Sequence, residues 1–410
     1  MPRQYKPLAA GALLFFLGAA AEADVAKSGN PAFDRAVELV IENFYDPSAL
    51  PHFEDTVKET IPTLPQSGDQ KAVDPAIQTV LASLGASHTG HYTADQLDYY
   101  ELLNVFQFNY RRDLPHLFPP EGRIVYPGIG IASKVIDGKR FVTAVYDGAP
   151  AKSAGVEQGD EIISADGAPF AEIGSFHGKI GKSVDIALRR GADAAPITIP
   201  VPVAELQPAE TLVSAISNSV SVVERDGHRI GYLHIWFYAD HDVGEAIDQA
   251  LSSEPLKNVD ALVLDLRCRW GGAPPDAAET FLGGTQPFRF IDRKGEGHLS
   301  NVRWHKPLVA IIDGGTRSGL EVFAYDLKAR GVPLIGVRTA GALLGGRGYL
   351  LPDDSLLELA VAGVEVNGEK IEGKGVEPDV VVPFDLRYAA GRDPQRDAAI
   401  SKALSLLSEG

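Results

Sequence analysis

The chain has 410 residues, of which 45% are hydrophobic and 23% are charged. These are ordinary values for a globular protein; they allow a sizeable core, and the length suits two to three domains. The formal net charge of −17 argues against nucleic acid or an anionic membrane as a partner, because both are polyanions.

The first 23 residues carry the features of a secretory signal peptide. Arg3 and Lys6 give a positive start, residues 8–20 form an apolar run too short to span a bilayer, and residues 21–23 read Ala-Glu-Ala. We therefore expect cleavage before Asp24, a periplasmic or secreted mature protein, and no stable membrane insertion after cleavage. A retained N-terminal anchor is the alternative interpretation.

The sequence contains a single cysteine, Cys268, which cannot form a disulfide within the chain. A disulfide-free exported protein fits the bacterial periplasm, because a large core makes such bridges unnecessary. No His or Asn lies nearby in the pattern of a cysteine protease. We therefore interpret Cys268 as a buried thiol at the end of a strand rather than as a nucleophile.

Residues 24–120 are predicted to form a helical region. Apolar side chains recur on one face between residues 31 and 60, and further helices are expected over 75–84 and 94–105. A polar, turn-rich stretch covers residues 85–91. Prolines near residue 120 indicate a linker to the next region.

Residues 121–205 are predicted to form a small β-rich domain, because short β-branched runs alternate there with turns. Residues 206–390 alternate between strand and helix instead, which predicts an α/β core. Residues 391–410 hold a final helix. The core elements expected in chain order are strand 230–235, helix 242–251, strand 261–266, helix 275–282, strand 308–312, helix 319–330, strand 334–337 and strand 356–362.

Two strand-to-helix turns of this core, residues 264–272 and 312–321, are the candidates for chemistry. Ligands gather at the carboxyl ends of strands in α/β sheets, and glycine amides at a helix N-terminus can donate to an oxyanion. Ser318 lies just before Gly319, where a helix is expected to begin. From this position alone, Ser318 is either a nucleophile or an ordinary helix N-cap.

Several segments, in this order, resemble the C-terminal-processing (tail-specific) serine peptidases. Residues 265–272 (DLRCRWGG) are similar to the family's DLR-x-N-x-GG segment, residues 316–324 (TRSGLEVFA) to its nucleophile segment, and residues 375–379 (GVEPD) to its G-[IV]-x-PD ending. Residues 127–204 resemble the family's PDZ domain. The resemblance implies a multidomain α/β protein, with a crotonase-like α/β catalytic core, an N-terminal helical region and an inserted β-rich PDZ-like domain.

The resemblance also implies roles for particular residues. Ser318, three positions before Glu321, would be the nucleophile of an exported endopeptidase that works without a cofactor or metal. The PDZ-like loop would bind the free C-terminus of a protein or peptide substrate through its backbone, adding the peptide as an edge strand. The loop residues are Gly128, Ile129, Gly130 and Ile131.

The sequence departs from the family where many members place a catalytic lysine, because Ala342 occupies that position. A serine hydroxyl still needs a base to take its proton. A related branch, the tricorn-like peptidases, uses a Ser-His-Ser-Glu tetrad. The resemblance to that branch implies His88 as general base, with Glu372 acting through Ser87 to orient the imidazole.

The backbone amides of Gly271 and Gly319 would then form the oxyanion hole. Several alternatives remain open from the sequence. His91 is a second candidate base, the pair His88 and His91 could bind a metal although no third ligand follows at suitable spacing, and Glu372 could be an ordinary surface carboxylate.

Two other functions compete with the peptidase. A catalytically inactive homologue that binds peptides or small apolar ligands is suggested by Ala342. An acyl hydrolase acting on small esters would share the acyl-enzyme chemistry, but Thr316 and Arg317 precede the serine where that class has a Gly-x-Ser-x-Gly elbow. A metalloprotease is not indicated, because the sequence has no His-Glu-x-x-His motif.

Overall fold

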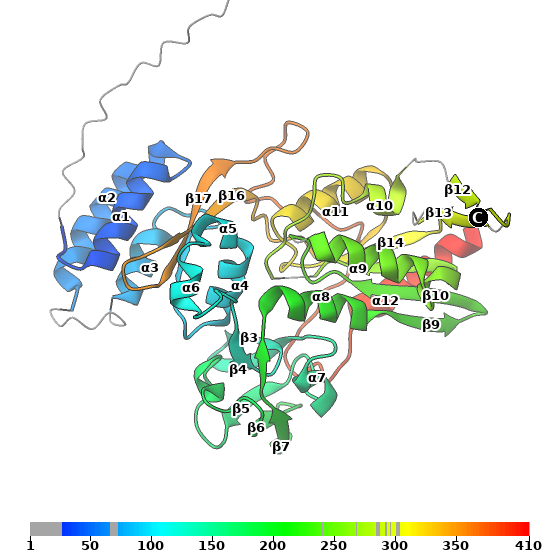
Figure 1. Ribbon diagram of the computed structural model, residues 1–410, viewed down its shortest axis with the longest axis horizontal. Coiled ribbons are helices and arrows are strands. Elements are labelled where there is room, and N and C mark those ends of the chain that lie inside the picture. The colour runs from blue at the N-terminus through cyan, green and yellow to red at the C-terminus, as the bar shows by residue number, and fades with distance from the viewer. Residues whose placement is uncertain are drawn as a thin grey trace, which may run out of the picture.

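The computed structural model describes residues 27–65, 73–239, 241–267, 269–283, 288–291, 293–295, 297–300 and 304–409, without the side chains of 241, 288–290 and 297–300. The predicted signal peptide and Cys268 lie outside the described residues. Three parts are distinguishable: a helical N-terminal part, a β-rich domain and an α/β core (Figure 1). Among the described helices, none combines the length and the apolar character needed to cross a bilayer.

The N-terminal part is helical, as predicted. Its first helix begins where Asn30 accepts a hydrogen bond from the Phe33 amide and Pro31 occupies the first turn, which suits a helix start. Phe33, Val37 and Val40 are buried on one face of this helix. The elements are α1 (Pro31–Asn43), α2 (Leu50–Thr60), α3 (Asp74–Ala82), β1 (Gly90–Tyr92), α4 (Leu97–Val105), α5 (Gln107–Tyr110) and α6 (Leu114–Leu117), with short 3-10 turns at Pro47–Ala49 and Ile61–Thr63.

A hairpin from late in the chain completes this part. β16 (Leu344–Leu350) and β17 (Leu356–Gly363) pair with each other, and β17 pairs with β1 in the order β1-β17-β16. Leu357 and Leu359 of the hairpin are buried in one cluster with Phe33 of α1. Figure 1 shows the hairpin lying beside α3 and α4, so residues assigned by sequence to the α/β region pack on the N-terminal helices.

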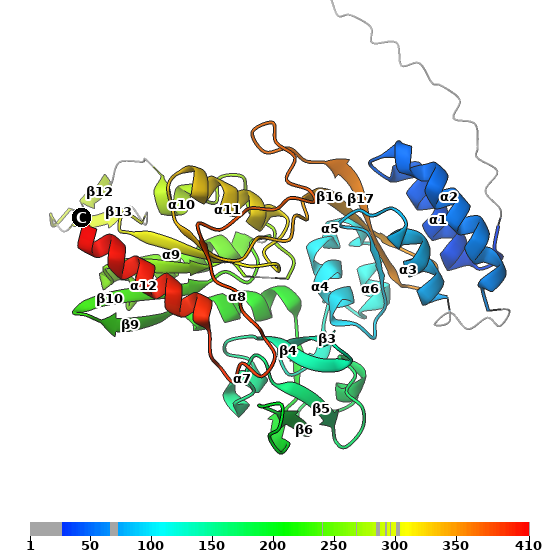
Figure 2. The same ribbon diagram turned by 180° about the vertical axis from the view of Figure 1, so that it is seen from behind.

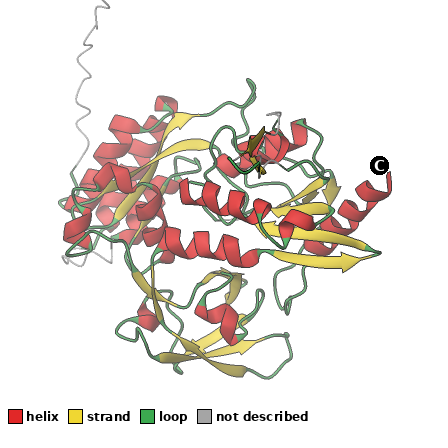
Figure 3. Ribbon diagram, turned by 45° about the vertical axis from the view of Figure 1, so that its right-hand side comes forward, coloured by secondary structure: helices red, strands yellow, loops and turns green. Residues whose placement is uncertain are grey.

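The middle domain is a five-stranded antiparallel sheet with its own buried cluster. Figure 3 shows it as the strand-rich lower part of the molecule. Its strand order is β3-β4-β5-β6-β7, so β3 lies at an edge. The elements are β2 (Tyr126–Gly128), β3 (Ile131–Ile136), β4 (Lys139–Val145), α7 (Pro150–Ala154), β5 (Glu161–Ala165), a 3-10 turn (Gly174–Phe176), β6 (Ser183–Arg189), β7 (Ile197–Pro202) and β8 (Ala204–Leu206), the last paired with β2.

The α/β core is built on a six-stranded sheet in the order β18-β15-β14-β11-β10-β9, parallel except for β9. Helix α12 covers one face of the sheet, and α8, α9 and α11 lie on the other (Figures 1 and 2). The elements are α8 (Pro208–Ser219), β9 (Ser221–Arg225), β10 (His228–His234), α9 (His241–Ser252), a 3-10 turn (Leu256–Asn258), β11 (Ala261–Asp265), α10 (Glu279–Leu282), β12 (Phe288–Ile291), β13 (Gly297–Ser300), β14 (Leu308–Ile312), α11 (Gly319–Ala329), β15 (Leu334–Gly336), β18 (Val380–Val381) and α12 (Pro394–Glu409).

Most of the predicted core elements are present, with two differences. The helix expected over 275–282 is confined to Glu279–Leu282, preceded by turns that start at the prolines 274 and 275. The strand expected over 356–362 exists as β17 but lies outside the parallel sheet, because its partners are β1 and β16.

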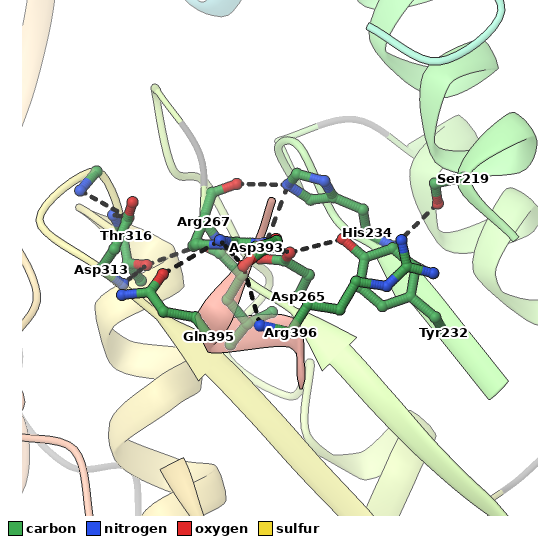
Figure 4. Close-up of polar contacts among 12 residues, drawn as sticks. Ser219, Tyr232, His234, Asp265, Arg267, Asp313, Thr316, Asp393, Gln395 and Arg396 are labelled. Atoms are coloured by element: carbon green, nitrogen blue, oxygen red, sulfur yellow. Dashed lines mark hydrogen bonds and ion pairs between the residues drawn. The ribbon is translucent and has the colours of Figure 1, made fainter. Parts of the chain in front are cut away.

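A buried polar network fixes α12 under the carboxyl ends of β10 and β11 (Figure 4). Asp265 is fully buried; it accepts hydrogen bonds from Nε of Arg267 at 2.9 Å and from the Tyr232 hydroxyl at 2.7 Å. The same guanidinium donates to Asp393 and Gln395, both at 3.1 Å, at the start of α12. The Asp and Arg of the DLR segment therefore act as structural anchors here, because a buried charge must be paired.

Candidate active site

Ser318 occupies a strained turn between β14 and α11. Its φ of 54° and ψ of −134° are rare for a residue with a side chain, and such a conformation costs about 1–3 kcal/mol. Ser318 stands at the N-cap position, yet its side chain makes no capping hydrogen bond. The hydroxyl is thus not used as a helix cap, and the turn has the strained strand-to-helix form of a nucleophile elbow although the Gly-x-Ser-x-Gly sequence is missing.

A loop from the far side of α11 holds this turn in place. The Ser318 amide donates to the carbonyl of Ala342 at 2.9 Å. The amides of Gly341 and Ala342 donate in turn to the carboxylate of Glu321 at 2.8 and 2.7 Å. Glu321 is fully buried one turn into α11, and burial raises its pKa. The residue that replaces the family lysine therefore supports the serine through its backbone.

Ser87, His88 and Glu372 come together although 285 residues separate Ser87 from Glu372. The Ser87 hydroxyl lies 3.0 Å from Nδ1 of His88 and donates to Oε2 of Glu372 at 2.9 Å. The Ser87 amide donates to the other carboxylate oxygen at 3.1 Å. Glu372 is thus fixed by the backbone and the side chain of Ser87, and is not an isolated surface carboxylate.

This relay selects the tautomer of His88. A serine hydroxyl has one proton, and Ser87 gives it to Glu372, so Ser87 can only accept from the imidazole. Nδ1 of His88 must therefore carry the ring proton, which leaves Nε2 with its lone pair available as a base. The three residues can hold the imidazole in the form that abstracts a proton.

The surroundings keep the imidazole neutral and fix its position. His88 is 8% exposed, and burial together with the positive charge of Arg317 lowers its pKa from 6.5 to about 4. Its backbone has a φ of 51°, so like Ser318 it has a positive φ, which is uncommon for a residue with a side chain. Strand β16 packs on the ring at Gly346, where an added Cβ would lie 3.1 Å from Cδ2 of His88.

One loop joins the relay to the nucleophile turn. The Leu343 amide donates to Oε2 of Glu372 at 2.6 Å, and the preceding residue, Ala342, accepts from the Ser318 amide. No direct hydrogen bond joins the Ser318 hydroxyl to His88 within the described part of the chain. Such contacts are often long before substrate binds, so the transfer of the Ser318 proton to His88 stays a prediction.

The two predicted oxyanion-hole glycines adjoin Ser318. A Cβ added to Gly271 would lie 2.8 Å from Cβ of Ser318, and one added to Gly319 would lie 2.4 Å from the Ala273 nitrogen, so both positions require glycine. Gly319 is the first residue of α11, and its amide has no acceptor within the helix. Donation by Gly271 and Gly319 to an oxyanion stays a prediction.

The predicted carboxylate-binding loop lines a pocket of the β-rich domain. Gly130 has a φ of 79° there, and a Cβ on it would collide with Ala149 at 2.2 Å. The pocket lies where the domain meets the N-terminal part, since the Leu97 amide of α4 donates to Glu172 at 3.3 Å. Its lining comprises Gly128, Ile129, Gly130, Ile131, Ser133, Leu97, Tyr126, Phe170, Glu172 and Phe176. Binding of a peptide carboxylate by this loop stays a prediction.

The competing roles of His91 lose support from the geometry. His91 is 1% exposed, and its Nε2 lies 2.7 Å from the Ser355 hydroxyl in the N-terminal part. His88 and His91 therefore face different partners. Across the described residues, no three His, Cys, Asp or Glu side chains gather in a way that could hold a metal ion.

Sequence reasoning missed four residues around the site: Arg317, Trp270, Tyr92 and Glu358. Tyr92 of β1 donates to Glu358 of β17 at 3.3 Å, and burial raises the pKa of Glu358 to about 7. The signal for Glu358 was present, because a carboxylate interrupts the apolar run 356–360. The other three have no distinctive pattern and become neighbours only through the fold.

A strained serine at an α/β elbow, a buried imidazole and a Ser-Glu relay define a candidate serine hydrolase site. The models of peptidase family S41 and of the PDZ domain match residues 229–382 and 127–201 of this chain. Residues 229–382 thus form an S41 peptidase domain and residues 127–201 a PDZ domain, and the chain is a homologue of the C-terminal processing and tricorn proteases. The predicted family and fold class are thereby confirmed.

Two relatives illustrate the extent of the similarity. The carboxy-terminal processing protease CtpB of Bacillus subtilis is 27% identical over 282 residues, which cover 65% of this chain and 57% of that protein. Tricorn protease homolog 1 of Streptomyces coelicolor is 27% identical over 286 residues, covering 63% of this chain and 25% of that protein. The chain thus spans about half of the first relative and a quarter of the second.

Two solved structures share the fold. The photosystem II D1 C-terminal processing protease has a TM-score of 0.50 at 21% identity, covering 90% of this chain and 99% of that one. The tricorn protease has a TM-score of 0.53 at 19% identity, covering 92% of this chain and 36% of that one.

Proposed function

We propose that this protein is an exported serine endopeptidase that cleaves protein or peptide substrates presented by their C-terminal tails. The observation that carries the proposal is the hydrogen-bonded relay from Glu372 through Ser87 to Nδ1 of His88, with separations of 2.9 and 3.0 Å. It supplies a base in a family member that has Ala342 where a lysine is usual.

The chemistry proceeds through an acyl-enzyme. Nε2 of His88 takes the proton of Ser318 as Oγ attacks the scissile carbonyl carbon, and the imidazolium then gives that proton to the departing amine. Water, deprotonated by the same ring, attacks the ester and releases the second product. The amides of Gly271 and Gly319 stabilise the oxyanion in both steps.

The PDZ domain delivers the substrate. Its pocket is lined by residues of β3, an edge strand of the sheet, so a peptide can add as a further strand while its terminal carboxylate meets the backbone around Gly128 and Gly130. Binding there raises the effective concentration of the tail near Ser318. A matched pair of peptides with free and amidated C-termini measures this contribution.

A fluorophosphonate probe tests the nucleophile directly. The mature protein should form one covalent adduct, which mass spectrometry places on Ser318, and Ser318→Ala should form none. The peptidase is supported if the wild type cleaves peptides, and cleaves those with a free C-terminal carboxylate faster than those with an amidated one. Labelling with turnover of small esters alone would identify an acyl hydrolase. No adduct in a folded protein that still binds peptides would identify an inactive binding protein.

Export is tested separately. In cells that produce the full chain, we expect the mature protein in the periplasmic or secreted fraction, with Asp24 as its first residue. A cytoplasmic protein that retains residues 1–23 would contradict this part of the proposal and leave the catalytic part standing.

A further inference from the structure

Arg317, the residue directly before the proposed nucleophile, has no ion-pair partner among the residues that the structure describes. Its side chain is half-buried, and no Asp or Glu within the described residues lies close enough to pair with it. Its guanidinium also makes no hydrogen bond to any described residue. Arginines held partly out of water usually pair with a carboxylate, so this one has donors to spare next to the proposed reaction centre.

An aromatic platform holds the guanidinium in position. The Arg317 guanidinium carbon lies 5.5 Å from the centroid of the Trp270 ring. Trp270 is itself fixed, because its indole nitrogen donates to Glu101 and its ring meets the edge of Tyr92 at 6.4 Å. A guanidinium that lies over an aromatic ring keeps its in-plane N–H groups free. Two of these N–H groups can donate hydrogen bonds to the two oxygens of a carboxylate.

Two titratable groups near Arg317 respond to its positive charge. Arg317 lowers the pKa of Glu358, but burial outweighs this attraction and raises that pKa to about 7. His88, on the same side, is neutral because its pKa is lowered to about 4. Arg317 is thus a positive charge directly beside Ser318 in a chain of formal net charge −17.

We propose that Arg317 is a specificity residue that binds a carboxylate of the substrate beside the scissile bond. The carboxylate is either the side chain of an Asp or Glu next to the cleaved bond or the free C-terminus of a short leaving segment. This inference rests on the proposed peptidase function and narrows its substrate class. A charge-assisted, two-pronged hydrogen bond of this kind changes turnover on the order of tenfold.

Matched peptides test the two sources of carboxylate. One series carries Asp or its neutral isostere Asn at each position around the cleaved bond, with the C-terminus amidated. The other series has no acidic side chain and ends in a free carboxylate or an amide one to three residues after the cleaved bond. Mass spectrometry of the products locates the bond, and kcat/KM is compared within each pair.

We expect the wild type to favour the charged member of one series about tenfold. Arg317→Gln should abolish this preference, Arg317→Lys should retain part of it, and the control Arg225→Gln should leave it unchanged, since Arg225 is exposed at the outer edge of the sheet. The series in which kcat/KM differs between the charged and the neutral peptide identifies the source of the carboxylate. A preference that survives Arg317→Gln would instead be due to the PDZ domain.

The outcomes separate this inference from the proposed function. If fluorophosphonate labels Ser318 but neither series distinguishes charged from neutral members, the role of Arg317 is refuted and the peptidase stands. If Ser318 does not label, the peptidase fails, and the affinity of Ser318→Ala for the Asp and Asn peptides tests Arg317 alone. Equal affinities of Ser318→Ala for the Asp and Asn peptides would overturn the inference. So would a difference in affinity that persists in the double variant Ser318→Ala with Arg317→Gln.

Discussion

Two residues with proposed catalytic roles, Ser318 and His88, have positive backbone φ values of 54° and 51°. Strain of this kind persists only where the surroundings enforce it. For Ser318 the enforcing contact is the hydrogen bond to Ala342, and for His88 it is the relay through Ser87 together with the packing of β16. Both side chains are therefore aimed by the backbone before any substrate arrives.

Removing the relay should disable the base while leaving the fold intact. Ser87→Ala loses the link between His88 and Glu372, and we expect kcat/KM to fall on the order of 100-fold, within the usual range for general-base catalysis. Ser355→Ala is the matched control, because Ser355 makes the same kind of contact with the buried His91. That control should keep kcat/KM near the wild-type value. Equal losses in the two variants would show that the relay has only a structural role.

The pH dependence of activity should reflect the low pKa of His88. In the proposed mechanism the neutral imidazole is the base. Its pKa is lowered from 6.5 to about 4, so kcat/KM should hold its value as pH falls from 7 and decline only near pH 4. The contribution of His88 to the free energy of unfolding changes with pH in the same direction. It is complete above pH 6.5 and is lost as the pH falls toward 4. A decline centred at pH 6.5 in folded protein would show an imidazole exposed to water.

At the scale of elements, the hairpin β16–β17 positions His88, the proposed base. Gly346→Val would place a side chain against Cδ2 of His88, where even a Cβ lies only 3.1 Å away. A displacement of about 1 Å at a catalytic group can cost on the order of 100-fold in rate, so kcat/KM should fall steeply. Gly363→Val, later in the same hairpin, has no neighbour closer than 3.8 Å and serves as control. Comparable rates for the two variants would contradict this role of the hairpin.

The sequence was sufficient for elements whose pattern is local. The strand predicted over 308–312 is β14 without change, because five consecutive buried apolar residues specify it. Helix α11 begins at Gly319, as expected. The pairing of β17 with β1 could not be found in this way, because it joins segments that lie more than 260 residues apart and no periodicity encodes such a partner.

The site divides in the same manner. Ser318, His88, Ser87 and Glu372 were chosen from motifs that resemble a family, and the structure brings the last three into one hydrogen-bonded group. The strain at Ser318, the support from Glu321 and the placement of Arg317 over Trp270 depend on side chains from several elements meeting in space. The residue type of a single Ser, Glu or Arg does not predict such spatial contacts until the fold is known.

At the scale of the whole molecule, the buried network of Asp265 and Arg267 ties α12 to the core. Burial raises the pKa of Asp265, but Arg267 and His234 outweigh it and hold that pKa well below 3.8, so this contribution to stability is present above pH 3.8 and lost at lower pH. Arg267→Met leaves the Asp265 charge unpaired and should lower the free energy of unfolding by about 3–5 kcal/mol. Arg225→Gln should change it little.

Denaturant titration at pH 7 measures this effect, with circular dichroism to establish that both variants are folded. A loss below about 1 kcal/mol for Arg267→Met would mean that the network is no more stabilising than a surface ion pair.

The relay and Ser318 adjoin different buried clusters: Leu84, just before the relay, lies in the cluster of helices α1–α3, and Leu320, just after Ser318, lies in a second cluster that joins the α/β core to α4. In the proposed mechanism, neither His88 nor Ser318 can cut a peptide bond without the other. Cleavage would therefore require both clusters to have formed, and a partly folded chain would lack the complete set of reacting groups.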